Sequence, residues 1–260
     1  MKTKIIVRVS VAAVLILTGL YIWHLFHAPA GAEEKEAPPP DNAVQEQVDG
    51  YEDEDEDAGQ AVWPKQSDID SGYLILVNKS NGLDRYYKPD DLTDIKYFAA
   101  DRSAEGRFMR TAAADAFHSL VEEAERDGIT LAMTTAYRSY DFQSSLYNSY
   151  VANDGQEAAD RYSAKPGYSE HQTGLSADVS SPSVNYKLTS EFANTNEGKW
   201  LSENAHLFGF ILRYPYGKEG ITGYQYEPWH IRYVGPEAAT YIYNNEITLE
   251  EYIQLLEVEE

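Results

Sequence analysis

The sequence predicts a single domain containing both helices and strands, preceded by two segments of different character. From about Ser67 onward, apolar segments with helical or alternating spacing are separated by turn residues, and this part is long enough for one sizeable core. Before Ser67 the chain carries first an apolar run and then a strongly acidic stretch. We therefore expect the folded domain to span residues 67–260.

Residues 1–27 are expected to anchor the chain in a membrane. Basic residues precede an apolar run at 9–26, which is about as long as a membrane-spanning helix. This charge pattern predicts that the N-terminus lies inside the cell and the domain outside. A cleaved signal peptide is the alternative, because small residues around Ala30 have the spacing of a cleavage site. Both alternatives predict an extracytoplasmic domain.

Residues 28–66 are expected to form a disordered acidic linker, because they hold few large apolar side chains. The chain has a net charge of −22, and about half of it lies between Glu33 and Asp57. Such an excess of acidic groups argues against nucleic acid as a partner. Because the chain has no cysteine, any metal site must use histidine and carboxylate ligands.

Within residues 67–260 the expected elements follow from spacing and turn residues. Helices are predicted at 111–127, ended by Gly128, at 141–151, with Asp141 as N-cap, at 197–208, ended by Gly209, and at 236–243 and 249–256. Strands are predicted at 72–77, 129–136, 210–214 and 224–234. The segment around His171 and Asp178 is interpreted as loops.

Two of the four histidines in this part stand out. His118 and His206 lie on predicted helices and are discounted, although His206 could support a metal ligand from behind. His171 is followed seven residues later by Asp178, and His230 is preceded three residues earlier by a carboxylate.

The set His171, Asp178 and His230 matches the three protein ligands that catalytic zinc commonly takes. Glu227 would then be free to act as a general base beside the metal. By spacing alone, the alternative that these are ordinary surface polar groups stays open.

Four blocks, in this order, resemble the VanY-like D-alanyl-D-alanine carboxypeptidases. They are 136–139 (AYRS), 168–174 (YSEHQTG), 209–215 (GFILRYP) and 227–233 (EPWHIRY). That family belongs to a group of zinc peptidases that also includes VanX-type D,D-dipeptidases and cell-wall L,D-carboxypeptidases. The resemblance extends from about Gly72 to Val234.

The resemblance implies an α+β fold, with a small antiparallel sheet flanked by helices and the zinc at one end. It also implies that His171, Asp178 and His230 bind Zn²⁺ and that Glu227 is the general base. Ser176 departs from the family pattern, which usually has alanine there. Both residues are small, so we expect no loss of zinc.

Three further roles are carried over from the family. Arg138 is expected to polarise the scissile carbonyl and to stabilise the oxyanion, with a structural ion pair as the alternative. Gln143 and Ser169 match positions that contact the terminal residue of the substrate.

The expected function is that of a zinc-dependent D,D-carboxypeptidase removing the C-terminal D-alanine from peptidoglycan stem peptides. One alternative is an L,D-carboxypeptidase acting on tetrapeptide stems. Another is a non-catalytic, zinc-bearing module that binds wall peptides, although Glu227 and Arg138 would serve no purpose there. We expect a monomer whose partners are stem peptides and, through residues 1–27, the membrane.

Overall fold

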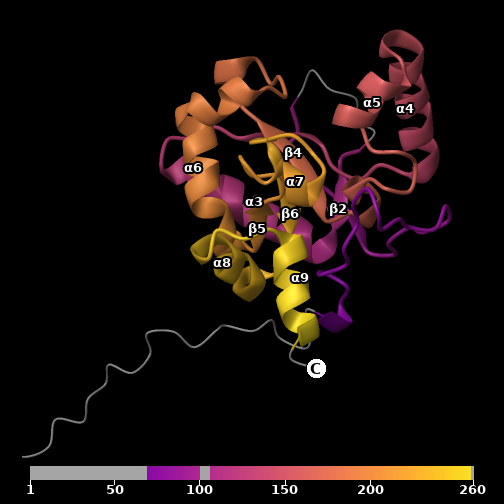
Figure 1. Ribbon diagram of the computed structural model, residues 1–260. Helices are drawn as coiled ribbons and strands as arrows, with labels where there is room; N and C mark the ends of the chain where they lie inside the picture. The colour runs from indigo at the N-terminus through magenta and orange to yellow at the C-terminus, as the bar shows by residue number, and fades with distance from the viewer. Residues whose placement is uncertain (1–68, 100–105, 259–260) are drawn as a thin grey trace, which may run out of the picture. The chain divides into compact units, whose positions relative to one another are not determined.

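The computed structural model describes residues 69–99 and 106–258 (Figure 1). The predicted anchor at 1–27 and linker at 28–66 lie outside these residues, so both stay predictions. Among residues 69–99 and 106–258, no helix combines the length and the apolar character needed to cross a bilayer.

The domain is built on a four-stranded antiparallel sheet in the order β3-β4-β6-β5. These strands are β3 (Ala132–Thr135), β4 (Ser176–Ser180), β6 (His230–Tyr233) and β5 (Phe210–Leu212). A separate antiparallel pair is formed by β1 (Leu92–Asp94) and β2 (Phe108–Arg110).

Helices flank the sheet, so the predicted α+β class is confirmed (Figure 1). The α-helices are α3 (Thr111–Arg126), α4 (Tyr140–Asp154), α5 (Gln156–Tyr162), α6 (Asn196–Asn204), α7 (Glu219–Thr222), α8 (Pro236–Asn244) and α9 (Leu249–Val258). Short 3-10 helices are η2 (Glu170–Thr173), η3 (Pro182–Val184), η4 (Ser190–Asn194) and η5 (Ala205–Phe208).

The two faces of the sheet have different chemistry, because successive side chains of a strand point to opposite sides. On β4 and β6, Ala177, Val179 and Ile231 belong to the main hydrophobic core, together with the buried face of α3. The alternate residues Asp178 and His230 are polar and equally buried. One face of the sheet therefore packs on α3, and the other carries polar side chains.

Glycine residues explain two of the predicted helix ends. Gly128 follows α3 with φ +77° and Gly209 follows η5 with φ +80°, so both predicted stops are confirmed. At Gly209 a Cβ would approach Cε2 of Tyr233 to 2.7 Å, which favours glycine there for space as well. The predicted helix at 197–208 divides into α6 and η5.

The N-cap of α4 is a correction. Asp141 was the predicted cap, but the side chain of Ser139 accepts the hydrogen bond from the backbone N–H of Phe142 at 3.2 Å. Asp141 instead lies in the first turn, where a carboxylate is favourable to the helix dipole.

Two strand predictions also need correction. Residues 72–77 form turns and irregular backbone instead of a strand, and the carbonyls of Tyr73 and Ile75 accept hydrogen bonds from the guanidinium of Arg232. Only His230–Tyr233 of the predicted strand at 224–234 is extended in the sheet. A buried arginine therefore satisfies backbone groups that a neighbouring strand would otherwise bond.

Candidate metal centre and active site

The pairing of β4 with β6 brings two of the predicted ligands together. Asp178 and His230 lie directly opposite each other in this antiparallel pair, and the carboxylate Oδ1 is 3.0 Å from Nδ1 of His230. The segment read as a loop at Asp178 is thus a strand, which holds the carboxylate on a rigid element.

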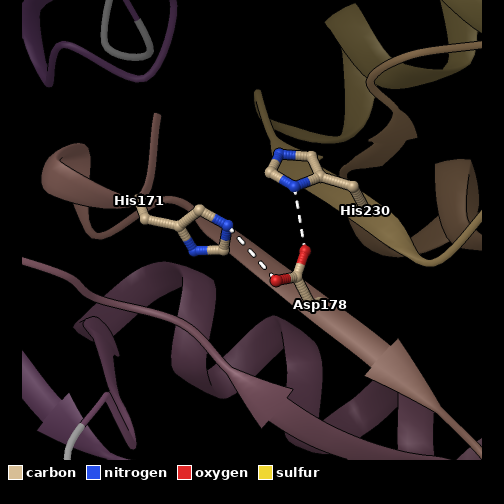
Figure 2. A group of neighbouring side chains, drawn as sticks. All are labelled: His171, Asp178 and His230. Atoms are coloured by element: carbon tan, nitrogen blue, oxygen red, sulfur yellow. Dashed lines mark hydrogen bonds and ion pairs between the residues drawn. The ribbon is translucent and has the colours of Figure 1, made fainter. Parts of the chain in front are cut away.

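His171 completes the cluster from η2, which ends at Gly174 in the left-handed conformation. Its Nε2 lies 3.5 Å from Oδ2 of Asp178, so the two imidazoles flank the carboxylate (Figure 2). One ligand atom from each of the three residues lies within 4.8 Å of the others. The arrangement brings together the whole predicted ligand set.

Each of the two imidazoles directs one ring nitrogen toward Asp178 and contacts another protein group with its second ring nitrogen. The Nδ1–H of His171 donates to the carbonyl of Ala136 at 2.6 Å, which leaves Nε2 toward Asp178. Nε2 of His230 lies 3.4 Å from Oε2 of Glu170, which leaves Nδ1 toward Asp178. Imidazoles held in this way from behind are typical of metal ligands, so the donor set fits a zinc ion.

Burial lowers the pKa of His171 to about 4, and the nearby guanidinium of Arg138 acts in the same direction. The imidazole is therefore neutral near pH 7, as a metal ligand must be. Burial alone would lower the pKa of His230 too, but its bonds to Asp178 and Glu170 outweigh this effect and raise the pKa to about 9.

Glu170 is a residue that sequence reasoning missed. It is 1% exposed and its carboxylate contacts His230, Ser176 and the guanidiniums of Arg213 and Arg232. Burial would raise the pKa of this carboxyl, but the two guanidiniums hold it well below its usual range. The sequence did carry a signal, because Arg213 and Arg232 stand in otherwise apolar segments that were predicted to be strands. An arginine buried in this way needs a carboxylate partner.

Glu227 lies next to the ligands but is not one of the three. Its Oε2 is 4.0 Å from Nδ1 of His230, and its side chain is 12% exposed. Burial raises the pKa of Glu227 to about 7. A carboxyl with such a pKa can both accept and return a proton near neutral pH.

Arg138 also lies beside the cluster, with Nη2 4.0 Å from Oδ2 of Asp178. Gln143 on α4 fixes its direction, because the side-chain amide donates to the carbonyl of Ala164 at 2.7 Å and its Oε1 accepts from Nη1 of Arg138 at 2.9 Å. The guanidinium is therefore held by a neutral amide while it points toward the ligands.

All seven predicted site residues line one pocket of about 480 Å³. Buried Ser169 forms part of its wall, and Trp229, Tyr224 and Tyr150 add aromatic surface. The pocket therefore combines a metal-binding cluster, a carboxyl group and a guanidinium in one concave site.

The two discounted histidines lie elsewhere. His118 accepts a hydrogen bond from the backbone N–H of Lys96, and His206 stacks on Tyr243 with ring centroids 3.9 Å apart. Neither position supports a metal ligand, so the suggested supporting role of His206 is wrong and that of Glu170 takes its place.

Comparison with known proteins agrees with this geometry. The VanY family model, described as D-alanyl-D-alanine carboxypeptidase, matches residues 106–236, which contain the whole cluster. The chain belongs to the VanY family.

Two curated relatives of this VanY-family chain are similar over most of the folded part. YodJ of Bacillus subtilis (strain 168), whose carboxypeptidase activity is itself inferred, is 45% identical over 183 residues, covering 70% of this chain and 67% of YodJ. A D-alanyl-D-alanine carboxypeptidase of Enterococcus faecium is 40% identical over 203 residues, covering 75% of this chain and 61% of that protein. The match thus spans about two thirds of the length of these relatives.

Solved structures of similar proteins extend the comparison to the metal. The L,D-carboxypeptidase LdcB is 44% identical with a TM-score of 0.66, covering 69% of this chain and 84% of LdcB. A vancomycin resistance D,D-pentapeptidase VanY, solved in complex with Zn(II), is 34% identical with a TM-score of 0.59, covering 70% of this chain and 98% of that one. This VanY-family chain is therefore a zinc metallocarboxypeptidase, and Zn²⁺ is its cofactor.

Proposed function

We propose that the chain is a zinc-dependent D,D-carboxypeptidase that removes the C-terminal D-alanine from peptidoglycan stem peptides. The observation that carries this proposal is the grouping of Glu227 and Arg138 around the cluster of His171, Asp178 and His230 in one pocket. D-alanyl-D-alanine carboxypeptidases among the relatives support it further.

His171, Asp178 and His230 hold the zinc in this proposal. Zinc bound there supplies Lewis-acid chemistry, polarising a carbonyl and making water more acidic. Glu227 takes a proton from the attacking water while the water oxygen bonds to the carbonyl carbon. When the C–N bond breaks, Glu227 returns that proton to the leaving amine.

Arg138 donates hydrogen bonds to the carbonyl oxygen as negative charge develops on it. Gln143 keeps the guanidinium in place, because it occupies Nη1 with a neutral acceptor. Ser169, which lines the same pocket, contacts the terminal residue of the substrate together with Gln143.

An L,D-carboxypeptidase acting on tetrapeptide stems is the second candidate, favoured by the similarity to LdcB at 44% identity. Both reactions use the same ligands and base, so they differ only in the residue that must fit before the scissile bond. A module that binds wall peptides without cutting them has no use for a buried base beside a metal.

We further propose an extracytoplasmic location, supported by the basic residues that precede the apolar run at 9–26. In this proposal residues 1–27 anchor or direct the chain, residues 28–66 act as an extended acidic spacer, and residues 67–260 work in the wall as a monomer.

The test is to incubate the purified protein with defined tetrapeptide and pentapeptide stems and to determine the masses of the products. Release of one D-alanine from the pentapeptide alone supports the D,D-enzyme, and release from the tetrapeptide alone supports the L,D-enzyme. A chelator should abolish turnover and added zinc should restore it; full activity in metal-free protein would contradict the mechanism.

A further inference from the structure

The carboxylate behind His230 belongs to a network of buried charges that reaches the C-terminal helix. Oε1 of Glu170 accepts from Nε of Arg213 at 2.7 Å and from Nη1 of Arg232 at 2.6 Å. The other two nitrogens of Arg213 donate to both oxygens of Glu250 on α9, at 2.8 and 2.6 Å.

The network is closely balanced in charge. Arg213, Arg232 and Glu170 are fully buried, and the Glu250 side chain is 14% exposed. Arg213 pairs with both carboxylates, and Arg232 pairs with Glu170. In a buried site, removing one partner of such a set leaves a charge without compensation. Glu250 therefore balances the charge of Arg213, whose other partner, Glu170, contacts His230.

Glu250 is also fixed from its other side. The side-chain amide of Asn78 donates to its Oε1 at 3.2 Å. At the far end, Ser176 donates to Oε2 of Glu170, the oxygen that lies against His230. Hydrogen bonds therefore fix each side chain that connects α9 to the imidazole of His230, namely Glu250, Arg213 and Glu170.

We propose that Glu250 is a positioning residue of the metal centre, acting through Arg213 and Glu170 on the imidazole of His230. Glu250 lies outside residues 106–236, which the family model matches, so α9 contributes to the centre from beyond that segment. The proposal rests on the ligand role of His230 in the proposed function, but not on the identity of the substrate.

Two effects follow when Glu250 loses its charge. The guanidinium of Arg213 loses its strongest acceptors and competes more strongly for Glu170, which draws that carboxylate away from His230. The network also gains a positive charge near a site that must bind a cation. Both effects weaken zinc binding.

The experiment compares Glu250→Gln with Glu251→Gln. Glu251 is the next residue of the same helix; it pairs with Lys218 at 3.2 Å and accepts from the backbone N–H of Thr248 at 2.8 Å. Glutamine removes the charge of Glu251, keeps an oxygen that can accept from Thr248, and leaves the network untouched. Zinc affinity is measured on metal-free protein by competition with a chelator, and thermal unfolding of the metal-free forms reports on the fold.

Glu250→Gln should bind zinc about 10-fold more weakly, at the lower end of the 10- to 100-fold loss typical for partners of metal ligands. Glu251→Gln should keep the affinity of the unaltered protein. KM measured at saturating zinc should be unchanged in both, since Glu250 is not among the residues that line the pocket.

Unaltered zinc affinity in Glu250→Gln would overturn the proposal, and so would an equal loss in the two variants. If Glu250→Gln does not fold, Glu250→Asp retains the charge but withdraws it by one methylene, and an intermediate loss is expected; full affinity there contradicts the proposal. His230→Ala distinguishes a failure of this proposal from a failure of the proposed function. If that variant retains zinc, the ligand set itself is contradicted.

Discussion

Glu227 and His230 are three residues apart, and their surroundings prepare them for different tasks. His230 is enclosed by Asp178 and Glu170, whereas Glu227 faces the pocket with its carboxylate 4.0 Å from the imidazole. A residue held on both sides is suited to bind a metal, and a carboxylate that lines the pocket beside the cluster is suited to move a proton.

Substitution at these two positions should separate base from ligand. Glu227→Gln preserves size but cannot accept a proton, so it should keep zinc and lose about 10² to 10⁴ in rate. His230→Ala should lose zinc as well. Metal content and rate are measured together on both variants; near-normal rates in Glu227→Gln would mean that another group is the base.

Zinc binding should release a proton from His230. Its pKa is raised to about 9 in the metal-free protein, so the imidazole is charged at pH 7.5 and must become neutral to bind the metal. About one proton should therefore leave per zinc at pH 7.5, and binding should weaken as the pH falls. Calorimetry in buffers of different ionisation enthalpy measures this number, and a value near zero would show that His230 is already neutral.

Single elements place the residues proposed to contact the substrate, and α4 is the clearest case. It carries Gln143, which orients Arg138, and it begins at the cap Ser139 directly after that arginine. The cap was not evident from sequence, because Ser139 and Asp141 are both good capping residues and only the backbone conformation distinguishes them.

Ser139→Ala should lower the free energy of unfolding by about 1 kcal/mol, because it leaves an N–H of the first helical turn without its acceptor. Asp141→Ala removes the residue that sequence favoured as cap and should cost less, since it loses a favourable charge at the helix start but no cap. Thermal or urea unfolding of the two variants gives the comparison. A larger loss in Asp141→Ala would assign the cap to Asp141.

At the scale of the whole molecule, the folded part contains every proposed site residue, and the main core lies within it. Residues 66–260, produced without the predicted anchor and linker, should therefore be soluble, bind zinc and turn over stem peptides. Gel filtration, metal analysis and product masses check this. If the fragment is unfolded, or is inactive although it binds zinc, the predicted domain boundary is wrong.

Sequence by itself determined the kind of chemistry and much of the local structure. The grouping of His171, Asp178 and His230 was predictable because the blocks that hold them resemble the VanY family, whereas spacing alone left ordinary surface polar groups as an alternative. The ends of α3 and η5 were predictable too, because a glycine with positive φ is a local signal.

Only the tertiary structure decided how distant segments meet. The register that sets Asp178 opposite His230, and the network joining Glu170 to Arg213, Arg232 and Glu250, depend on pairs 37 to 62 residues apart. Residues 72–77 have the composition of a buried strand, yet carbonyls of this segment bond the guanidinium of Arg232. Propensity acts within a few residues, whereas the partners of a buried charge are set by packing between remote parts of the chain.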